Sequence, residues 1–177
     1  MQCGEYSIRP IEEKDLKLLL KWRNSERIHS VMLTDHKINW DEHCEWFKKV
    51  SGYAPKRNFI FEYRGKPIGY MGYTQFDEVN KTCSPGAYLG EDSDDIPIDA
   101  AIYLFYYAID YAFEVLKQKA LITTVFKTNK RALRIDGILG YEIIGSKQVI
   151  KNNKIDDIYI LEMTKENWSK NRNKFNI

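Results

Sequence analysis

Cysteine is scarce in this sequence, and its placement excludes a disulfide or metal framework. Among 177 residues there are three cysteines, Cys3, Cys44 and Cys83, which lie far apart and form no C-x-x-C pair. An odd number of isolated thiols argues against disulfides and suits a reducing compartment. The three histidines are spaced seven residues apart, whereas zinc ligands come at closer spacings with cysteine or carboxylate partners. We therefore expect no bound metal.

Long apolar runs and a dominant charge are also missing. The longest apolar run, AAIYLFYYAI, stops at Asp110 and is too short to span a bilayer, and MQCGEYSIRP lacks the pattern of a signal peptide. The 27 basic and 25 acidic side chains nearly cancel and are interspersed, which argues against nucleic-acid and membrane partners. With 44% hydrophobic residues, we expect one cytoplasmic domain over residues 1–177.

Apolar periodicity predicts the order of helices and strands. Helices are expected where apolar residues recur at intervals of three and four, with Asn39 and Gly52 capping one helix and Asn129 beginning the last. Short β-rich runs predict strands, two of which form a hairpin around Arg64-Gly65-Lys66. The order β-α-α-β-β-β-α-β-α-β-β predicts a mixed α/β (α+β) fold. The expected helices cover residues 12–24, 39–52, 99–117 and 129–139, and the expected strands cover 6–11, 58–63, 67–76, 83–92, 120–126, 141–150 and 156–163.

One segment near the end of the chain suggests a family. Residues 128–142, TNKRALRIDGILGYE, predict the end of a strand, an Asn that starts a helix, an apolar stripe and a Gly-Tyr where the helix stops. Together with the order of elements, this segment resembles the GNAT superfamily of acyl-CoA-dependent N-acetyltransferases over nearly the whole chain. The resemblance implies a mixed sheet whose splayed central strands, here AYLGE and LITTVF, hold the pantetheine arm of acetyl-CoA.

A narrower resemblance lies in the N-terminal half. The segment KWRNSERIHSVMLTDHKINWDEHCEWFKKV, with its WRN, DH-x-I and EH-x-x-WF patterns, is similar to the nucleotide-sugar N-acetyltransferases of pseudaminic acid synthesis. Those enzymes acetylate the 4-amino group of UDP-4-amino-4,6-dideoxy-N-acetyl-altrosamine. FIFEYRGKPIG and CSPGAYLGED resemble the third and fourth strands of the same family, although Ala87 departs slightly from the usual pattern.

The narrower resemblance implies a set of substrate contacts, most of which also have a structural explanation. Arg23 ends a helix, where the dipole favours a cation whatever the function. His43 is equally a hydrogen-bonded core residue, and Tyr88 a half-buried strand aromatic. A Met in the loop that lines the uracil pocket of the family is more often plain core. The implied substrate-binding residues are Arg23, Asn24, Met32, Leu33, His43, Thr74 and Tyr88.

The wider resemblance implies a site for acetyl-CoA, which this sequence alters. The family holds the CoA pyrophosphate with a Gly-rich turn at the start of the central helix, where free N–H groups favour anions. This chain has DSDDIPIDAAIY there, without glycine, and Asp99 as N-cap with Asp92, Asp94 and Asp95 nearby would repel the diphosphate. Lys127, Lys130, Arg131 and Arg134 offer other phosphate contacts. The implied cofactor-binding residues are Leu89, Gly90, Ile98, Asp99, Ala100, Ala101, Ile102, Asn129, Arg131 and Ala132.

Asp136 stands where the superfamily places a Tyr that protonates the departing thiolate. An exposed Asp is ionised at neutral pH and is a poor general acid unless burial raises its pKa strongly. Its neighbours Arg134 and Gly137 favour a solvent-facing helix position. The candidate catalytic residues are Tyr88, His43 and Asp136. The base is expected to be a water chain that ends on Tyr88, His43 or a strand carbonyl.

The sequence supports one main hypothesis and leaves alternatives open. We expect an N-acetyltransferase that moves acetyl from acetyl-CoA to a primary amine by direct attack, helped by backbone N–H groups of the fourth strand. The amine is expected on a nucleotide-linked amino sugar, and a homodimer is possible. The alternatives are a protein N-terminus or a polyamine as acceptor, or a non-catalytic GNAT-fold binding module with a decayed CoA site.

Overall fold

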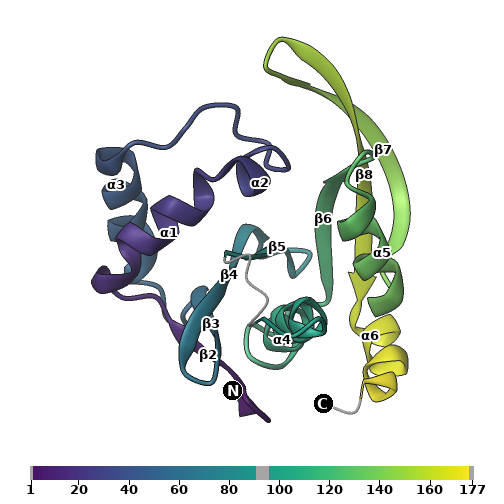
Figure 1. The fold of residues 1–177 in the computed structure, drawn as a ribbon. Coiled ribbons are helices and arrows are strands. Elements are labelled where there is room, and N and C mark those ends of the chain that lie inside the picture. Colours follow the sequence, from purple (N-terminus) through teal and green to yellow (C-terminus); the bar gives the residue numbers. More distant parts are fainter. Residues whose placement is uncertain (1, 91–95, 176–177) are drawn as a thin grey trace. The chain divides into compact units, whose positions relative to one another are not determined.

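The computed structural model describes residues 2–90 and 96–175, which divide into two compact units (Figure 1). The first unit is Met1–Gly72 with Ala87–Leu104, and the second is Tyr73–Gly86 with Phe105–Ile177. Strands β4 (Lys66–Asp77) and β5 (Thr82–Leu89) and helix α4 (Ala100–Glu114) each contribute residues to both units. Within the described residues, no helix is long and apolar enough to cross a membrane.

The first unit is built on an antiparallel run of strands with three helices between the second and third. Strand β2 pairs with β3 with Ile8 opposite Phe61, and β3 pairs with β4 with Ile60 opposite Tyr70. The Gly90 N–H donates to the Ile68 carbonyl at 2.8 Å and so brings the residue after β5 to β4. The elements are β1 (Gln2–Cys3), β2 (Tyr6–Pro10), a 3-10 turn η1 (Glu13–Asp15), α1 (Leu16–Arg23), α2 (Glu26–His29), α3 (Trp40–Ser51) and β3 (Asn58–Tyr63).

The core of this unit forms where the apolar stripe of α1 meets β3. Leu19, Trp22, Ile28 and Ile60 make one fully buried cluster. The Trp22 ring lies against Gly90, where a Cβ atom would collide with the indole. The chain can therefore pass this close to the tryptophan only because Gly90 lacks a side chain.

The second unit contains both parallel and antiparallel strand pairs. Strand β6 (Ala120–Phe126) pairs antiparallel with β8 (Lys154–Thr164) along its whole length, and β8 pairs with β7 (Glu142–Lys151), with which it forms the long hairpin visible in Figure 1. Strand β5 runs parallel to β6 with Thr82 opposite Ala120 and Cys83 opposite Leu121. Among the described residues of this unit the parallel pairing ends there, as expected for central strands that splay.

Helix caps agree with the expectations from the sequence. Asn39 begins α3 and its side chain accepts from the Glu42 N–H at 2.9 Å. Asn129 begins α5 (Lys130–Leu139) and accepts from the Ala132 N–H at 3.2 Å, and Gly140 ends that helix with a φ of 101°. Both N-caps satisfy a backbone donor that would otherwise lack a partner, and the positive φ is readily adopted by glycine.

The C-terminal segment, for which the sequence made no prediction, is part of the second core. Helix α6 (Lys165–Asn171) and the 3-10 turn η2 (Arg172–Lys174) follow β8 directly. Trp168 is buried, and its indole N–H donates to Asp110 Oδ1 at 3.3 Å. Arg172 pairs with the same carboxylate at 3.0 Å. The indole also lies edge-on to the Tyr106 ring, with centroids 5.0 Å apart.

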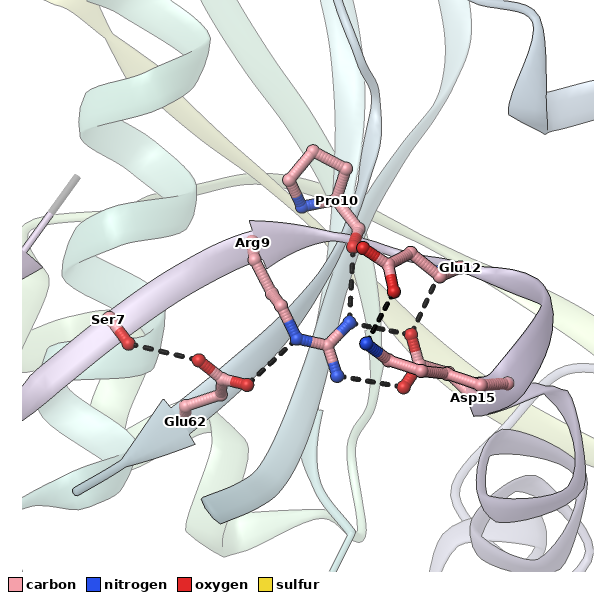
Figure 2. Close-up of polar contacts among 7 residues, drawn as sticks. Ser7, Arg9, Pro10, Glu12, Asp15 and Glu62 are labelled. Carbon is pink, nitrogen blue, oxygen red and sulfur yellow. Dashed lines mark hydrogen bonds and ion pairs between the residues drawn. The ribbon is translucent and has the colours of Figure 1, made fainter. Parts of the chain in front are cut away.

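A charged cluster fixes the start of α1 in the first unit. Figure 2 shows the Arg9 guanidinium bound bidentately to Asp15, with Nη1–Oδ2 at 2.6 Å and Nη2–Oδ1 at 2.8 Å. Its Nε also donates to Glu62 on β3 at 2.8 Å. Asp15 Oδ2 accepts the Glu12 N–H at 2.8 Å, which closes the turn before the helix. One arginine thereby joins β2, β3 and the entry to α1.

Asp15→Asn should destabilise the fold by about 1–3 kcal/mol, because a charge-assisted bidentate bond at a buried carboxylate is lost. Burial raises the pKa of Asp15, but the Arg9 guanidinium and the Glu12 N–H outweigh it and hold the pKa below its ordinary value. The stabilisation of the fold by ionised Asp15 is therefore fully present above the pKa of the unfolded state, near 3.9, and is lost as pH falls through the pKa of the folded state. Urea unfolding at pH 7 and at pH 3 measures both effects.

Lys14→Gln is the matched control, because Lys14 pairs with Glu12 through exposed side chains. We expect a change within about 0.5 kcal/mol for it. An equal effect of the two substitutions would show that the Arg9 cluster contributes no more than a surface ion pair.

Candidate active site

Arg23 is a half-buried cation at the end of α1 in the first unit. Its Nη1 atom is buried and has no hydrogen-bond partner among residues 2–90 and 96–175. Burial lowers the pKa of Arg23, opposed by the phenols of Tyr88 and Tyr70 and by Glu42. In the same part of the chain it forms no ion pair with a carboxylate. A guanidinium held in this way is available to an anionic or carbonyl oxygen of a ligand.

Two tyrosines beside Arg23 come from neighbouring strands. The rings of Tyr70 on β4 and Tyr88 on β5 have centroids 5.3 Å apart, and Trp46 of α3 lies edge-on to Tyr70 at 6.3 Å. The Tyr70 hydroxyl donates to Asn58 Oδ1 at 2.5 Å. Burial raises the pKa of both phenols, so both keep their protons at neutral pH. The sequence analysis named Tyr88 as a candidate and used Trp46 only within the EH-x-x-WF pattern. It did not name Tyr70 or Asn58, because only the pairing of β3 with β4 brings these two residues together.

Asn24 and His43 each make hydrogen bonds that explain their presence structurally. The Asn24 side chain donates to the Ile38 carbonyl at 2.7 Å and accepts the Ile38 N–H at 2.9 Å. His43 is buried and its Nε2 lies 3.0 Å from the Leu16 carbonyl, which can only accept, so Nε2 carries the proton. Burial lowers the pKa of His43, which leaves a neutral ring with its lone pair on Nδ1. Substrate roles for both residues remain predictions.

The remaining predicted substrate residues lie in different surroundings. Met32 packs against the Leu19–Trp22 cluster, which agrees with a core role. Leu33 is 52% exposed in the loop between α2 and α3. Thr74 is exposed on β4 and belongs to the second unit, whereas Met32 and Leu33 belong to the first.

The carboxylate of Asp99, at the start of α4, accepts a hydrogen bond within the protein. Oδ1 accepts from the Tyr6 hydroxyl of β2 at 2.7 Å, while the Asp99 carbonyl accepts the Ile102 N–H at 2.8 Å. Ala100 and Ala101 are buried and Ile98 is fully exposed. The hydrogen bond disperses part of the negative charge that the sequence predicted to repel a diphosphate. The predicted contributions of Asp92, Asp94 and Asp95 lie outside the described residues.

The backbone at the end of β5 is already engaged on both sides. Arg27 Nη2 donates to the carbonyls of Leu89 at 2.9 Å and Gly90 at 3.0 Å. The Gly90 N–H is bound to Ile68, so it is not available to polarise an acyl carbonyl. If backbone N–H groups polarise the thioester carbonyl, as the sequence predicts, they belong to residues other than Gly90.

Helix α5 of the second unit presents the other predicted contacts to CoA. Asn129 caps the helix through the Ala132 N–H, and Lys130, Arg131 and Arg134 are exposed. No ion pair holds these three cations within the described part of the chain. Exposed cations near a helix N-terminus suit the phosphates of a CoA molecule.

Asp136 is buried, which corrects the expected solvent-facing position. Asp136 is 3% exposed. It lies four residues after Ala132 and three before Leu139, so its side chain is on the inward-facing stripe of α5. Burial raises its pKa to about 7. Its charge acts on the buried phenol of Tyr141. A carboxyl group in this state is partly protonated at neutral pH and can donate a proton.

Comparison with known proteins decides the family. Residues 6–142 match the family model of the acetyltransferase (GNAT) domain. The chain belongs to the GNAT acetyltransferase family. It is therefore an acetyl-CoA-dependent N-acetyltransferase, and its mixed α/β architecture is the GNAT fold.

Relatives and solved structures extend the assignment. This GNAT protein is 29% identical over 125 residues to acetyltransferase PseH of Campylobacter jejuni, covering 71% of this chain and 75% of the relative. This confirms the resemblance to the acetyltransferases of pseudaminic acid synthesis. Spermidine N-acetyltransferase of Vibrio cholerae, solved with CoA and spermine, has a TM-score of 0.84 at 18% identity, over 93% of this chain and 98% of that one. A GNAT acetyltransferase of Bacillus anthracis has a TM-score of 0.77 at 16% identity, covering 93% and 98%.

Asp136→Asn should change how stability depends on pH. The folded pKa of about 7 exceeds the unfolded value near 3.9, so the folded state holds the proton more tightly and the stability of the natural protein falls as pH rises between these values. The neutral amide of Asp136→Asn removes this loss. From pH 5 to pH 8, the free energy of unfolding of the variant should therefore increase by about 2–4 kcal/mol relative to that of the natural protein. Urea unfolding of both proteins at the two pH values measures it.

The matched control is Glu166→Gln, an exposed carboxylate on α6. It should show no comparable difference between pH 5 and pH 8. Parallel pH profiles for natural protein and Asp136→Asn would mean that Asp136 is ionised in the folded state and cannot be a proton donor near neutral pH.

Proposed function

We propose that this enzyme acetylates the primary amine of a nucleotide-linked amino sugar, in the first instance the 4-amino group of a UDP-linked amino-deoxy sugar of the pseudaminic acid type. The similarity to PseH supports the reaction class, although 29% identity leaves the acceptor open. The protein would meet acetyl-CoA and its acceptor in the cytoplasm. The choice of acceptor rests on the surroundings of Arg23.

The observation that carries the proposal is the Arg23 guanidinium, which interacts electrostatically with two buried tyrosines and whose Nη1 lacks a partner within the described residues. Removing a cation from water without an ion pair costs stability, and replacing it by an apolar group would often be neutral or favourable. Arg23 Nη1 is buried without a hydrogen-bond partner in the described residues, beside Tyr70 and Tyr88. A nucleotide diphosphate supplies the oxygens that such a fork binds, and the aromatic rings suit the base or sugar.

The same surroundings argue against a polyamine. A polycation needs carboxylates, whereas Arg23 adds positive charge to this cluster. Glu42, whose charge reaches Arg23, is exposed and lies 3.1 Å from His36 Nε2. The spermidine acetyltransferase of Vibrio cholerae shares the fold at 18% identity, which says nothing about the substrate of this chain.

The residues present fit a bound acetyl-CoA, which supplies the activated acetyl carbonyl. In the first unit, phosphates would be bound at the start of α4, where Tyr6 engages Asp99. In the second unit, Lys130, Arg131 and Arg134 of α5 are exposed cations that suit phosphates. The unprotonated Nδ1 of His43 makes it the candidate base. Tyr88 keeps its proton and would orient the acceptor by hydrogen bonding, because burial raises its pKa. Asp136 would donate the proton that the thiolate leaving group takes up.

Arg23→Gln should raise the KM for a UDP-linked 4-amino sugar about 10- to 100-fold, because a charge-assisted hydrogen bond to the substrate is lost. The thermal stability should stay the same or increase, since an unpaired buried charge is removed. Release of CoA thiol, followed with a thiol reagent at saturating acetyl-CoA, measures the kinetics. Spermidine and an N-terminal peptide serve as alternative acceptors.

Lys21→Gln is the control, because Lys21 is an exposed cation on the same helix. Its kinetics should match those of the natural enzyme. Turnover of spermidine or the peptide without turnover of the amino sugar would overturn the proposal. Failure of the purified protein to bind acetyl-CoA would instead favour a module with a decayed CoA site.

A further inference from the structure

Asn58 carries a second buried donor that has no partner in the part of the chain that the structure describes. It is the first residue of β3, is 6% exposed, and its Nδ2 has no hydrogen-bond partner among the described residues. Buried amide groups in native proteins are nearly always satisfied, so a donor left over in this position calls for an acceptor from outside the chain. The residue does not figure among those that the sequence or the family resemblance singled out.

The orientation of the amide is fixed by Tyr70. The Tyr70 hydroxyl donates to Asn58 Oδ1 at 2.5 Å. Because the oxygen end accepts this bond, the NH2 end must point elsewhere. Gly72 lies opposite Asn58 in the β3–β4 pair, and a Cβ there would collide with the Tyr70 hydroxyl and lie 2.7 Å from Asn58 Oδ1. Tyr70 and Gly72 thus hold the Asn58 amide in one orientation, with Nδ2 as the remaining donor.

The unpartnered amide lies in the same side-chain cluster as Arg23. Tyr70 binds Asn58 through its hydroxyl and lies against the ring of Tyr88, and the charge of Arg23 acts on both phenols. The cluster therefore offers two donors of different kinds that have no partner among residues 2–90 and 96–175, a cationic guanidinium at Arg23 and a neutral amide at Asn58. A cation suits phosphate oxygens, and a neutral amide suits carbonyl or hydroxyl oxygens.

We propose that Asn58 is a specificity-determining residue, whose Nδ2 donates a hydrogen bond to an uncharged carbonyl or hydroxyl oxygen of the acceptor while Arg23 binds a charged one. Tyr70 is the positioning residue that orients the amide, and Gly72 leaves room for it. The inference rests on the proposed function, since it assumes a nucleotide-sugar acceptor. A site built around a buried donor discriminates against molecules that lack the matching oxygen, because the donor then stays unpaired.

The test compares two variants that differ in the amide. Asn58→Leu alone would leave the buried Tyr70 hydroxyl without its acceptor and could unfold the protein. It is therefore combined with Tyr70→Phe, so that the double variant lacks both the donor and the acceptor of this hydrogen bond. The reference is the single Tyr70→Phe variant, which keeps the Asn58 amide. Thermal melting confirms that both are folded. Calorimetry then measures the binding of UDP and of UDP-N-acetylglucosamine to each variant and to the natural protein.

We expect the double variant to bind UDP-N-acetylglucosamine about 10- to 100-fold more weakly than Tyr70→Phe does. A loss confined to this ligand places the acceptor oxygen on the sugar, and an equal loss for UDP places it on the nucleotide; either supports the proposal. Equal binding of both ligands by the two variants would overturn it and leave the proposed function standing. If the natural protein binds neither ligand, the nucleotide-sugar function fails and this inference fails with it.

Discussion

The first unit depends on the Arg9 guanidinium, which binds Asp15 and Glu62 together. Asp15 closes the turn before α1, so this cluster sets where the helix starts relative to β2 and β3 (Figure 2). The other end of the same helix carries Arg23. A salt bridge with well-matched bidentate geometry is suited to this task because it fixes orientation as well as distance. Two arginines on neighbouring elements thus have opposite roles: Arg9 is paired with two carboxylates, whereas Arg23 Nη1 has no hydrogen-bond partner among the residues that the structure describes.

Unsatisfied polar groups distinguish the candidate substrate cluster from the surrounding core. Leu19, Trp22 and Ile60 pack in a hydrophobic cluster. A short way along the same elements, Arg23 Nη1 and Asn58 Nδ2 are buried and have no hydrogen-bond partner among the described residues. Such groups lower the stability of the folded protein, and proteins commonly accept this cost where a ligand is bound. The aromatic rings of Tyr70 and Tyr88 reduce access of water and so strengthen any hydrogen bond that these donors make.

The sequence predicted local features well and the site only in part. Asn39, Asn129 and Gly140 could be read as helix ends because capping depends on neighbouring residues alone. Asn58 and Tyr70 could not be paired without the β3–β4 register, which joins residues twelve apart. Asp136 was misjudged because its charge was given more weight than its place on the apolar stripe of α5, between Ala132 and Leu139. The role of Trp168 depends on Asp110 and Tyr106, which are far away in the chain, so no neighbouring residue indicates it.

The burial of Trp168 bears on how the chain matures during synthesis. Domains form on the ribosome from the N-terminus onward, and a hydrophobic core stays open until its last contributor has emerged. Helix α4 is made some fifty residues before the indole that packs on Tyr106 and binds Asp110. The apolar face of α4 therefore stays uncovered, and accessible to chaperones or to aggregation, until translation has passed Trp168. For this enzyme, this part of the second core cannot close before Trp168 has been made.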